Sequence, residues 1–332
     1  MTHRIPPGTR DILPDEMREL RRVKSELANA FDRFGYEEVA TPTIEYHEVL
    51  ARGDERGAPE AYRFFDEAGE LLAMRTDMTI PIARLVASRF GDAEPPFRLS
   101  YIANAYRAIT PQRGQMREFT QAGLELIGAE APEGTAEVIE VLSAALDAVG
   151  LTRAVIGLGD ADLYRQALAE LGIEDEARDS LLEKLAMHDL VGLGEELEML
   201  DGVSSEQCET LVALSQLRGG SEVLNQAAEM GGDAVKRASA RLRDTFDELE
   251  RRGAADRVQI DLGLLRDLGY YSGAILEVYD PALGHVLGGG GRYDRLLERF
   301  GRDLPAAGFA LYLERLHVAQ AEEQALDERG DG

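Results

Sequence analysis

The sequence predicts an α+β fold, in which a mostly antiparallel sheet is flanked by helices and interrupted by a helical insertion. Three observations support this prediction. Strand-like segments follow one another as hairpins and unpaired strands instead of alternating regularly with helices. Residues 162–252 contain no proline and show short helical periods in Leu, Ala, Glu and Arg. Strand signals then return at 258–262 and 270–279.

The first half of the chain supplies most of the predicted sheet. Apolar residues at helical spacing predict a helix over 14–34, which is followed by Gly35 as a stop. Residues 63–66 and 71–74 flank a turn-forming segment and therefore predict a β-hairpin. A helix is predicted over 78–90, with Pro81 tolerated in its first turn. Two strands joined by a polar loop follow over 97–107 and 118–127, and a helix over 134–149 ends at Gly150.

The second half returns to the same sheet after the helical stretch. The glycine run 288–291 lacks the Lys-Ser/Thr of a phosphate-binding loop, so it indicates a close backbone approach between strands. The last element, 307–324, begins as a strand and becomes a helix. We expect one core, formed by 1–160 together with 253–325. A helical insertion domain should occupy 161–252, and 326–332 should form a frayed tail.

Composition limits the classes of function. The 332 residues carry 36 Lys and Arg against 62 Asp and Glu, a formal net charge of -26. Such a surface repels phosphate backbones, so non-specific nucleic-acid binding is not expected. No run of about 18 apolar residues is present and the start lacks a secretion signal, which predicts a cytoplasmic protein without a membrane span. Acidic neighbours predict an inert Cys208, and the scattered histidines predict no metal site. We expect no cofactor.

Polar side chains within the predicted strands are candidate site residues. Gln121 and Glu125 share one face of strand 118–127. A buried Glu125 would need a partner, whereas a solvent-facing strand face would explain both residues equally well. In strand 97–107, small residues lead to Arg107 on one face, where it could close a hollow as a carboxylate-binding fork. The alternative for Arg107 is an ordinary surface arginine.

Two further clusters combine polar and aromatic residues. Asp77 and Thr79 stand just before a predicted helix, and on its own Asp77 is better explained as a helix N-cap than as a site residue. Arg266 precedes the pair Tyr270-Tyr271. A tyrosine pair is more often a packing feature than a binding feature.

Taken together, these segments resemble histidyl-tRNA synthetase, a class II aminoacyl-tRNA synthetase. The resemblance covers about residues 5–128 and 258–320, and 162–252 corresponds in position to the family's insertion domain. The matching motifs occur in the family's order, at 7–14, Pro42, 106–128, 266–271 and 308–316. The resemblance implies the class II antiparallel sheet, a dimer formed around Pro42, and a histidine pocket formed by Asp77, Thr79, Arg107, Gln121, Glu125, Arg266, Tyr270 and Tyr271.

Within that implied pocket, each group of the amino acid has a counterpart. Asp77 and Gln121 would bind the ammonium, and an arginine would bind the carboxylate. Glu125 and Tyr271 would face the imidazole, whose charged form a carboxylate favours. Asp77 departs from the family's glutamate, which shortens its reach.

Other departures bear on catalysis. Ile109 stands where the family has a glutamate that reads adenine, and it cannot accept a hydrogen bond. Tyr312 replaces a small glycine of the ATP site, and we expect no anticodon-binding domain after the third motif. Residues 74–84 are closer to a non-catalytic paralogue, the regulatory subunit of ATP phosphoribosyltransferase. That resemblance implies a short-form catalytic subunit as partner, a hetero-oligomer inhibited by histidine, and no tRNA as substrate.

An amino-acid-activating ligase is the alternative. It would be a minimal histidyl-tRNA synthetase-like enzyme that uses Arg107, Arg117 and Arg315 on the phosphates of ATP. Ile109, Tyr312 and the acidic charge count against it.

Overall fold

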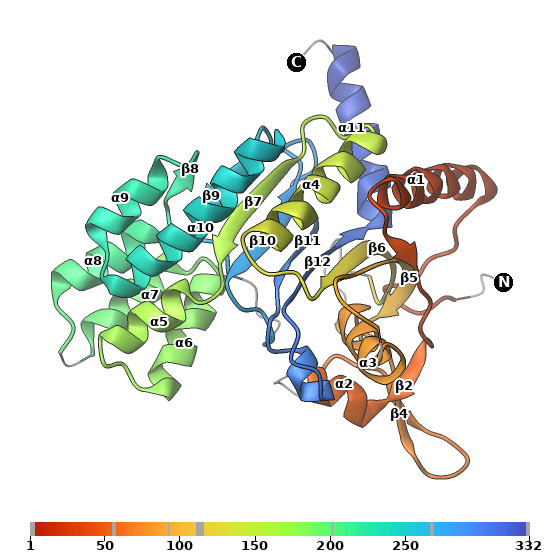
Figure 1. Ribbon diagram of the computed structural model, residues 1–332, viewed down its shortest axis with the longest axis horizontal. Coiled ribbons are helices and arrows are strands. Elements are labelled where there is room, and N and C mark those ends of the chain that lie inside the picture. Colours follow the sequence, from red (N-terminus) through yellow and green to blue (C-terminus); the bar gives the residue numbers. More distant parts are fainter. Residues whose placement is uncertain are drawn as a thin grey trace.

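A large mixed sheet forms the centre of the computed structural model, which describes residues 4–54, 58–91, 93–110, 116–200, 202–265 and 269–329 (Figure 1). Among these residues, neighbouring strands are antiparallel except for the pairs β1·β5 and β7·β9. This arrangement confirms the predicted α+β class and the mostly antiparallel sheet. In sheet order the strands are β1 (Glu37–Glu38), β5 (Phe97–Tyr106), β6 (Glu118–Ile127), β12 (Ala306–Tyr312), β11 (Val286–Arg292), β10 (Ala274–Tyr279), β7 (Val155–Asp160), β9 (Val258–Asp261) and β8 (Arg218–Gly219).

Helices cover both faces of this sheet. One face carries α1 (Pro14–Arg33), α4 (Glu133–Ala148) and α11 (Leu313–Arg329), which pack on one another and on β6 and β12. The other face carries α2 (His47–Gly53), α3 (Thr79–Arg89) and the short 3-10 helix η1 (Leu297–Phe300), which enclose a second apolar core with residues of β5. Because β6 lies between two cores, both of its faces are buried.

A small second sheet lies beside α2 and α3. Its strands are β2 (Ile44–Tyr46), β4 (Leu71–Met74) and β3 (Arg63–Phe65), paired in that order. The β3–β4 pair is the hairpin predicted from the turn-forming residues between the two strands. Helices α1, α3 and α4 likewise begin and end within one residue of their predicted bounds.

The predicted insertion is helical except at one point. Its helices are α5 (Leu163–Glu170), α6 (Asp175–Ala186), α7 (Leu190–Glu198), α8 (Ser205–Leu214), α9 (Val223–Met230) and α10 (Asp233–Arg252). The two-residue strand β8 interrupts them and pairs with β9 at the edge of the large sheet. The segment is also tied to the sheet by Arg241 of α10, which donates two hydrogen bonds to Asp160 of β7 at 2.9 and 3.0 Å.

Two predicted boundaries are wrong. Strand β10 begins at Ala274 instead of at Tyr270, because Gly269 and Gly273 have φ angles of +63° and +73° that no extended strand contains. Helix α11 continues to Arg329, so residues 326–329 of the predicted tail are helical. Its last turns are held by the ion pair of Arg153 with Asp327 at 2.8 Å. Within the described ranges, no helix is long and apolar enough to cross a bilayer.

Candidate functional site

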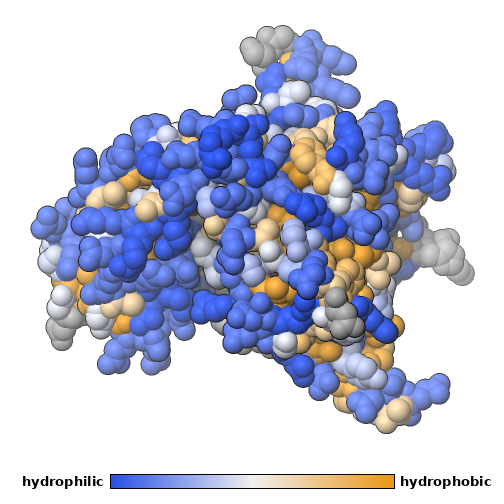
Figure 2. Space-filling view, in the orientation of Figure 1, coloured by the Kyte–Doolittle hydropathy of each residue, from blue (hydrophilic) through white to orange (hydrophobic). Residues whose placement is uncertain are grey.

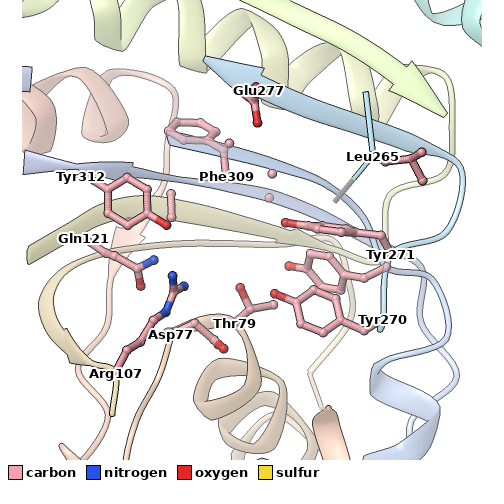
Figure 3. A pocket seen from close by; sticks show the side chains of 15 residues that line it. Asp77, Thr79, Arg107, Gln121, Leu265, Tyr270, Tyr271, Glu277, Phe309 and Tyr312 are labelled. Atoms are coloured by element: carbon pink, nitrogen blue, oxygen red, sulfur yellow. The ribbon is translucent and has the colours of Figure 1, made fainter. Parts of the chain in front are cut away.

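A cavity of about 240 Å³ lies between the large sheet and the start of α3 (Figure 3). Six of the eight residues proposed from the sequence line it together: Asp77, Thr79, Arg107, Gln121, Tyr270 and Tyr271. They come from positions up to 194 residues apart, so the fold assembles the cavity from separate segments. Glu125 lies immediately behind the cavity wall, and Arg266 lies outside the described residues.

Asp77 and Thr79 are placed by the first turn of α3. The Asp77 Oδ1 atom accepts a hydrogen bond from the Ile80 amide at 3.1 Å, so Asp77 satisfies an amide of the first turn in the manner of a cap, although the N-cap position itself is Met78. The same residue also lines the cavity, so binding the helix amide and lining the candidate site coincide in Asp77. Burial raises the pKa of Asp77, although the Ile80 amide and Arg107 oppose that shift.

Gln121 lines the cavity, and its side-chain oxygen is a buried acceptor without a hydrogen-bond partner. Its side chain is only 4% exposed, which excludes the solvent-facing alternative for this strand face. No described residue donates a hydrogen bond to its Oε1 atom. An unpaired buried polar atom costs about 1–3 kcal/mol, so a ligand that donates a hydrogen bond here would regain that energy.

Arg107 stands just beyond the end of β5, where its amide donates to the Arg117 carbonyl at 2.8 Å. Its guanidinium points into the cavity beside Gln121 and the Tyr312 hydroxyl (Figure 3). Glu60 is a distant ion-pair partner, with 3.7 Å between Nε and Oε2. Burial alone would lower the pKa of Arg107, but Tyr312, Glu60 and Asp77 raise it overall. The surface-arginine alternative is therefore excluded, and this cation is available to an anionic ligand group.

Three tyrosines form the opposite wall of the cavity. The rings of Tyr270 and Tyr271 lie 5.0 Å apart between centroids, and the rings of Tyr270 and Tyr293 lie 6.0 Å apart. The pair thus packs, as a tyrosine pair usually does, and it also lines the cavity.

Glu125 has protein partners in this structure. It is 1% exposed and accepts hydrogen bonds from Thr79 Oγ1 at 2.8 Å and from the Tyr293 hydroxyl. Burial raises the pKa of the Glu125 carboxyl to about 8, although the hydrogen bonds from Tyr293 and Thr79 lower it. Thr79 and Tyr293 both line the cavity, so the hydrogen bonds that they donate to Glu125 hold two residues of the cavity wall in place.

Glycines line part of the cavity wall, where the absence of a Cβ lets neighbouring groups approach closely. A Cβ added at Gly308 would overlap the Glu125 carboxyl, so this carboxyl packs directly against a glycine that lines the cavity. On β11, a Cβ at Gly288 or Gly290 would overlap carbonyls of β12. The glycine run 288–291 therefore marks a close approach between strands, as predicted, and Gly289 and Gly290 supply part of the cavity lining.

Sequence reasoning missed two polar residues of the lining, Glu277 and Tyr293. Glu277 lies in mid-β10, and a carboxylate between the apolar residues of a buried strand was the signal that could have found it. Tyr293 directly follows β11 and carried no comparable signal. Nowhere in the described ranges do three or more His, Cys, Asp or Glu residues gather as a metal site. Cys208 is buried, and burial raises the pKa of its thiol, which disfavours the reactive thiolate; that the residue is inert stays a prediction.

A second cavity, of about 490 Å³, adjoins the first. Its lining combines apolar and charged side chains: Arg10, Glu16, Glu60, Arg107, Ile109, Met116, Phe119, Leu283, His285, Tyr312, Glu314, Arg315 and Val318. Arg107 and Tyr312 line both cavities. Ile109 and Tyr312, which depart from the synthetase pattern at the ATP site, thus both face the second cavity.

Comparison with known proteins places this geometry in a family. Residues 8–316 match the family model described as histidyl-tRNA synthetase. The chain is 41% identical over 325 residues to the ATP phosphoribosyltransferase regulatory subunit of Symbiobacterium thermophilum. This match covers 97% of this chain and 81% of that protein. It is 40% identical over 318 residues to the subunit of the same name from Desulforamulus reducens, in a match that covers 95% of this chain and 79% of that protein.

The chain belongs to the ATP phosphoribosyltransferase regulatory subunit family. Among solved structures, it superposes with a TM-score of 0.88 on an ATP phosphoribosyltransferase regulatory subunit/histidyl-tRNA synthetase from Bacillus halodurans C. That match has 32% identity and covers 100% of this chain and 91% of the other. The regulatory-subunit family therefore shares the class II synthetase-like fold, as the sequence motifs predicted.

Proposed function

We propose that this chain is the non-catalytic regulatory subunit of a cytoplasmic ATP phosphoribosyltransferase, and that it binds free histidine as a feedback inhibitor. The partner is a short-form catalytic subunit, which performs the first step of histidine biosynthesis. The observation that carries the ligand assignment is the meeting of Gln121, Asp77 and Arg107 around one cavity, with the Gln121 oxygen left without a hydrogen-bond partner.

The cavity matches the charges of a free amino acid. Gln121 and Asp77 are acceptors for an ammonium group, and Arg107 is a donor for a carboxylate. The tyrosine wall offers aromatic faces and hydroxyls to a side-chain ring. Glu125, behind Gly308, supplies a carboxyl close to that ring position. Inhibition then requires histidine to bind one assembly state better than the other.

The second cavity supports the regulatory function over the ligase alternative. Two of its arginines are engaged by the protein: Arg10 pairs with Glu16 at 2.6 Å, and Arg315 donates to the Val286 carbonyl. Arg117 donates to the Ile109 carbonyl at 2.8 Å. A triphosphate would have to displace these partners, and Ile109 gives adenine no acceptor.

Self-association is part of the proposal. Beside Pro42, the small sheet exposes Ile44, Tyr46, Phe64 and Phe65, and Figure 2 shows apolar surface at this end of the molecule. Tyr46 and Phe65 are 51% and 71% exposed, which is unusual for large apolar side chains that have no partner surface. We propose that a second copy of the chain covers this face in a homodimer within the hetero-oligomer.

The first test is reconstitution with a short-form catalytic subunit. We expect turnover that depends on this chain and falls when histidine is added. Turnover that responds neither to the chain nor to histidine would refute the regulatory assignment.

The second test measures histidine binding by calorimetry on the chain and on Gln121→Met, which keeps the length of the side chain and removes its acceptor. We expect affinity to fall about tenfold or more, since the ammonium loses a charge-assisted hydrogen bond. Gln226→Met, at an exposed site on α9, is the matched control and should bind like the parent. Equal affinities for all three proteins would show that Gln121 does not contact the ligand.

A further inference from the structure

Tyr312 stands at the boundary between the two cavities. It is the last residue of β12 and lies directly opposite Gln121 in the β12–β6 register. Directly opposed residues of an antiparallel pair lie side by side, so the ring stands next to the Gln121 amide. The side chain lines both the 240 Å³ cavity and the 490 Å³ cavity.

The Tyr312 ring is held in place from several sides. It packs edge-on against Phe119, with 5.4 Å between ring centroids and 70° between ring planes. The Arg315 guanidinium lies 4.5 Å from its centroid, and Arg107 lies 5.1 Å from the centroid of Phe119. The buried Leu313 follows immediately as the first residue of α11, which fixes the backbone. Moving the ring aside would disrupt this stack of two arginines and two aromatic rings.

The carboxylate end of the proposed ligand faces this boundary. Arg107, the proposed carboxylate partner, is the other residue shared by both cavities. Figure 3 shows its guanidinium beside the Tyr312 hydroxyl. A substituent attached to the ligand's carboxyl carbon would therefore have to pass Tyr312 to enter the larger cavity.

We propose that Tyr312 is a specificity-determining residue, which confines the site to amino acids with a free carboxylate and excludes esters, amides and anhydrides of larger size. The inference rests on the proposed function, because it assumes that the 240 Å³ cavity binds an amino acid. It adds a physical separation between the ligand pocket and the larger cavity beyond it. The chain would thus respond to the free amino acid and ignore activated or conjugated forms of it.

The test compares two ligands that differ only in size at the carboxyl group. Histidine amide and histidine N-benzylamide both lack the carboxylate charge, so their affinity ratio isolates the steric effect. Calorimetry is carried out on the full chain, on Tyr312→Gly and on Tyr312→Phe. The phenylalanine variant keeps the ring and removes the hydroxyl, which separates bulk from hydrogen bonding.

In the parent we expect the benzylamide to bind at least about tenfold more weakly than the amide, because forcing a group into filled space is costly. Tyr312→Phe should keep that ratio, and Tyr312→Gly should bring it close to one. Equal binding of the two amides by the parent would overturn the proposal even if the glycine variant does not fold. A ratio unchanged in a folded Tyr312→Gly would overturn it as well. A parent that fails to bind histidine itself would instead count against the proposed function.

Discussion

Glu125→Gln tests whether the cavity is built around a buried carboxyl that stays protonated at neutral pH. The substitution keeps the shape of the neutral acid and removes the ionisation. The pKa of this carboxyl is raised from 4.5 to about 8, chiefly by burial. In the unfolded chain the group therefore loses its proton near pH 4.5, whereas in the folded chain it keeps the proton until about pH 8.

Linkage then fixes the direction of the effect. Between those two values the folded state binds more protons than the unfolded state, so the unfolding free energy falls as pH rises. Each unit of pKa difference corresponds to about 1.4 kcal/mol, and Glu125 should remove roughly 2 kcal/mol of stability between pH 5 and pH 7. This stabilisation is fully present below pH 4.5 and is lost as pH rises to about 8.

Urea unfolding of the parent and of Glu125→Gln at pH 5, 6 and 7 measures the effect. The free energy of the variant relative to the parent should rise by roughly 2 kcal/mol across this range. Glu118→Gln, an exposed position on the same strand, is the control and should show no such trend. Parallel pH profiles for the parent and Glu125→Gln would refute the assignment of a protonated buried carboxyl.

The same variant provides a functional measurement. Because Glu125 fixes Thr79 and Tyr293 in the cavity wall, its loss should lower histidine affinity by roughly ten- to a hundredfold. The reconstituted transferase should stay active and become less sensitive to histidine. An unchanged affinity would show that Glu125 stabilises the fold without serving the ligand.

Three further outcomes are expected. The purified chain should show no histidine-dependent ATP–pyrophosphate exchange, because Ile109 and Tyr312 face the second cavity; a rate of about 1 per second or more would favour the ligase alternative. Tyr46→Lys with Phe65→Lys should shift sedimentation toward the monomer at micromolar concentration, since both side chains are exposed on the small sheet; an unchanged dimer would place the interface elsewhere. Cys208→Ser should leave histidine inhibition of the reconstituted complex unchanged, because the thiol lies in the insertion, away from both cavities; a changed inhibition curve would contradict an inert thiol.

Local patterns were sufficient to predict most elements of the fold. Helix α1 follows from the spacing of its apolar residues, and the β3–β4 hairpin follows from the turn between its strands. Alternation predicted β6 but left open whether the face with Gln121 and Glu125 was buried or solvent-facing, because helices from distant parts of the chain cover both faces. The start of β10 was missed because positive φ at Gly269 and Gly273 depends on the surrounding loop.

The residues that line the cavity could be predicted from the sequence, whereas their arrangement could not, and their function remains a prediction. Motif resemblance brought together residues that do line one cavity, such as Asp77 and Gln121. It could not show that Glu125 lies behind a glycine, since that depends on the register of Gly308 against β6. Nor could it show that Tyr312 borders two cavities, because cavity walls are formed by several strands at once.

The attachment of the helical insertion limits how this protein could be shortened or recombined. Strand β8 supplies hydrogen bonds to the edge of the main sheet, and Arg252 of α10 pairs with Glu140 of α4 at 2.9 Å. Deleting residues 161–252 would therefore expose an unpaired strand edge and strip one side of α4. Asp160 lies outside the segment and accepts hydrogen bonds from Arg241 inside it. An exchange of this segment between related subunits would therefore succeed only when β9, α4 and Asp160 are exchanged with it. The segment is therefore an integral part of the folded core, although its sequence looks like that of a separable helical domain.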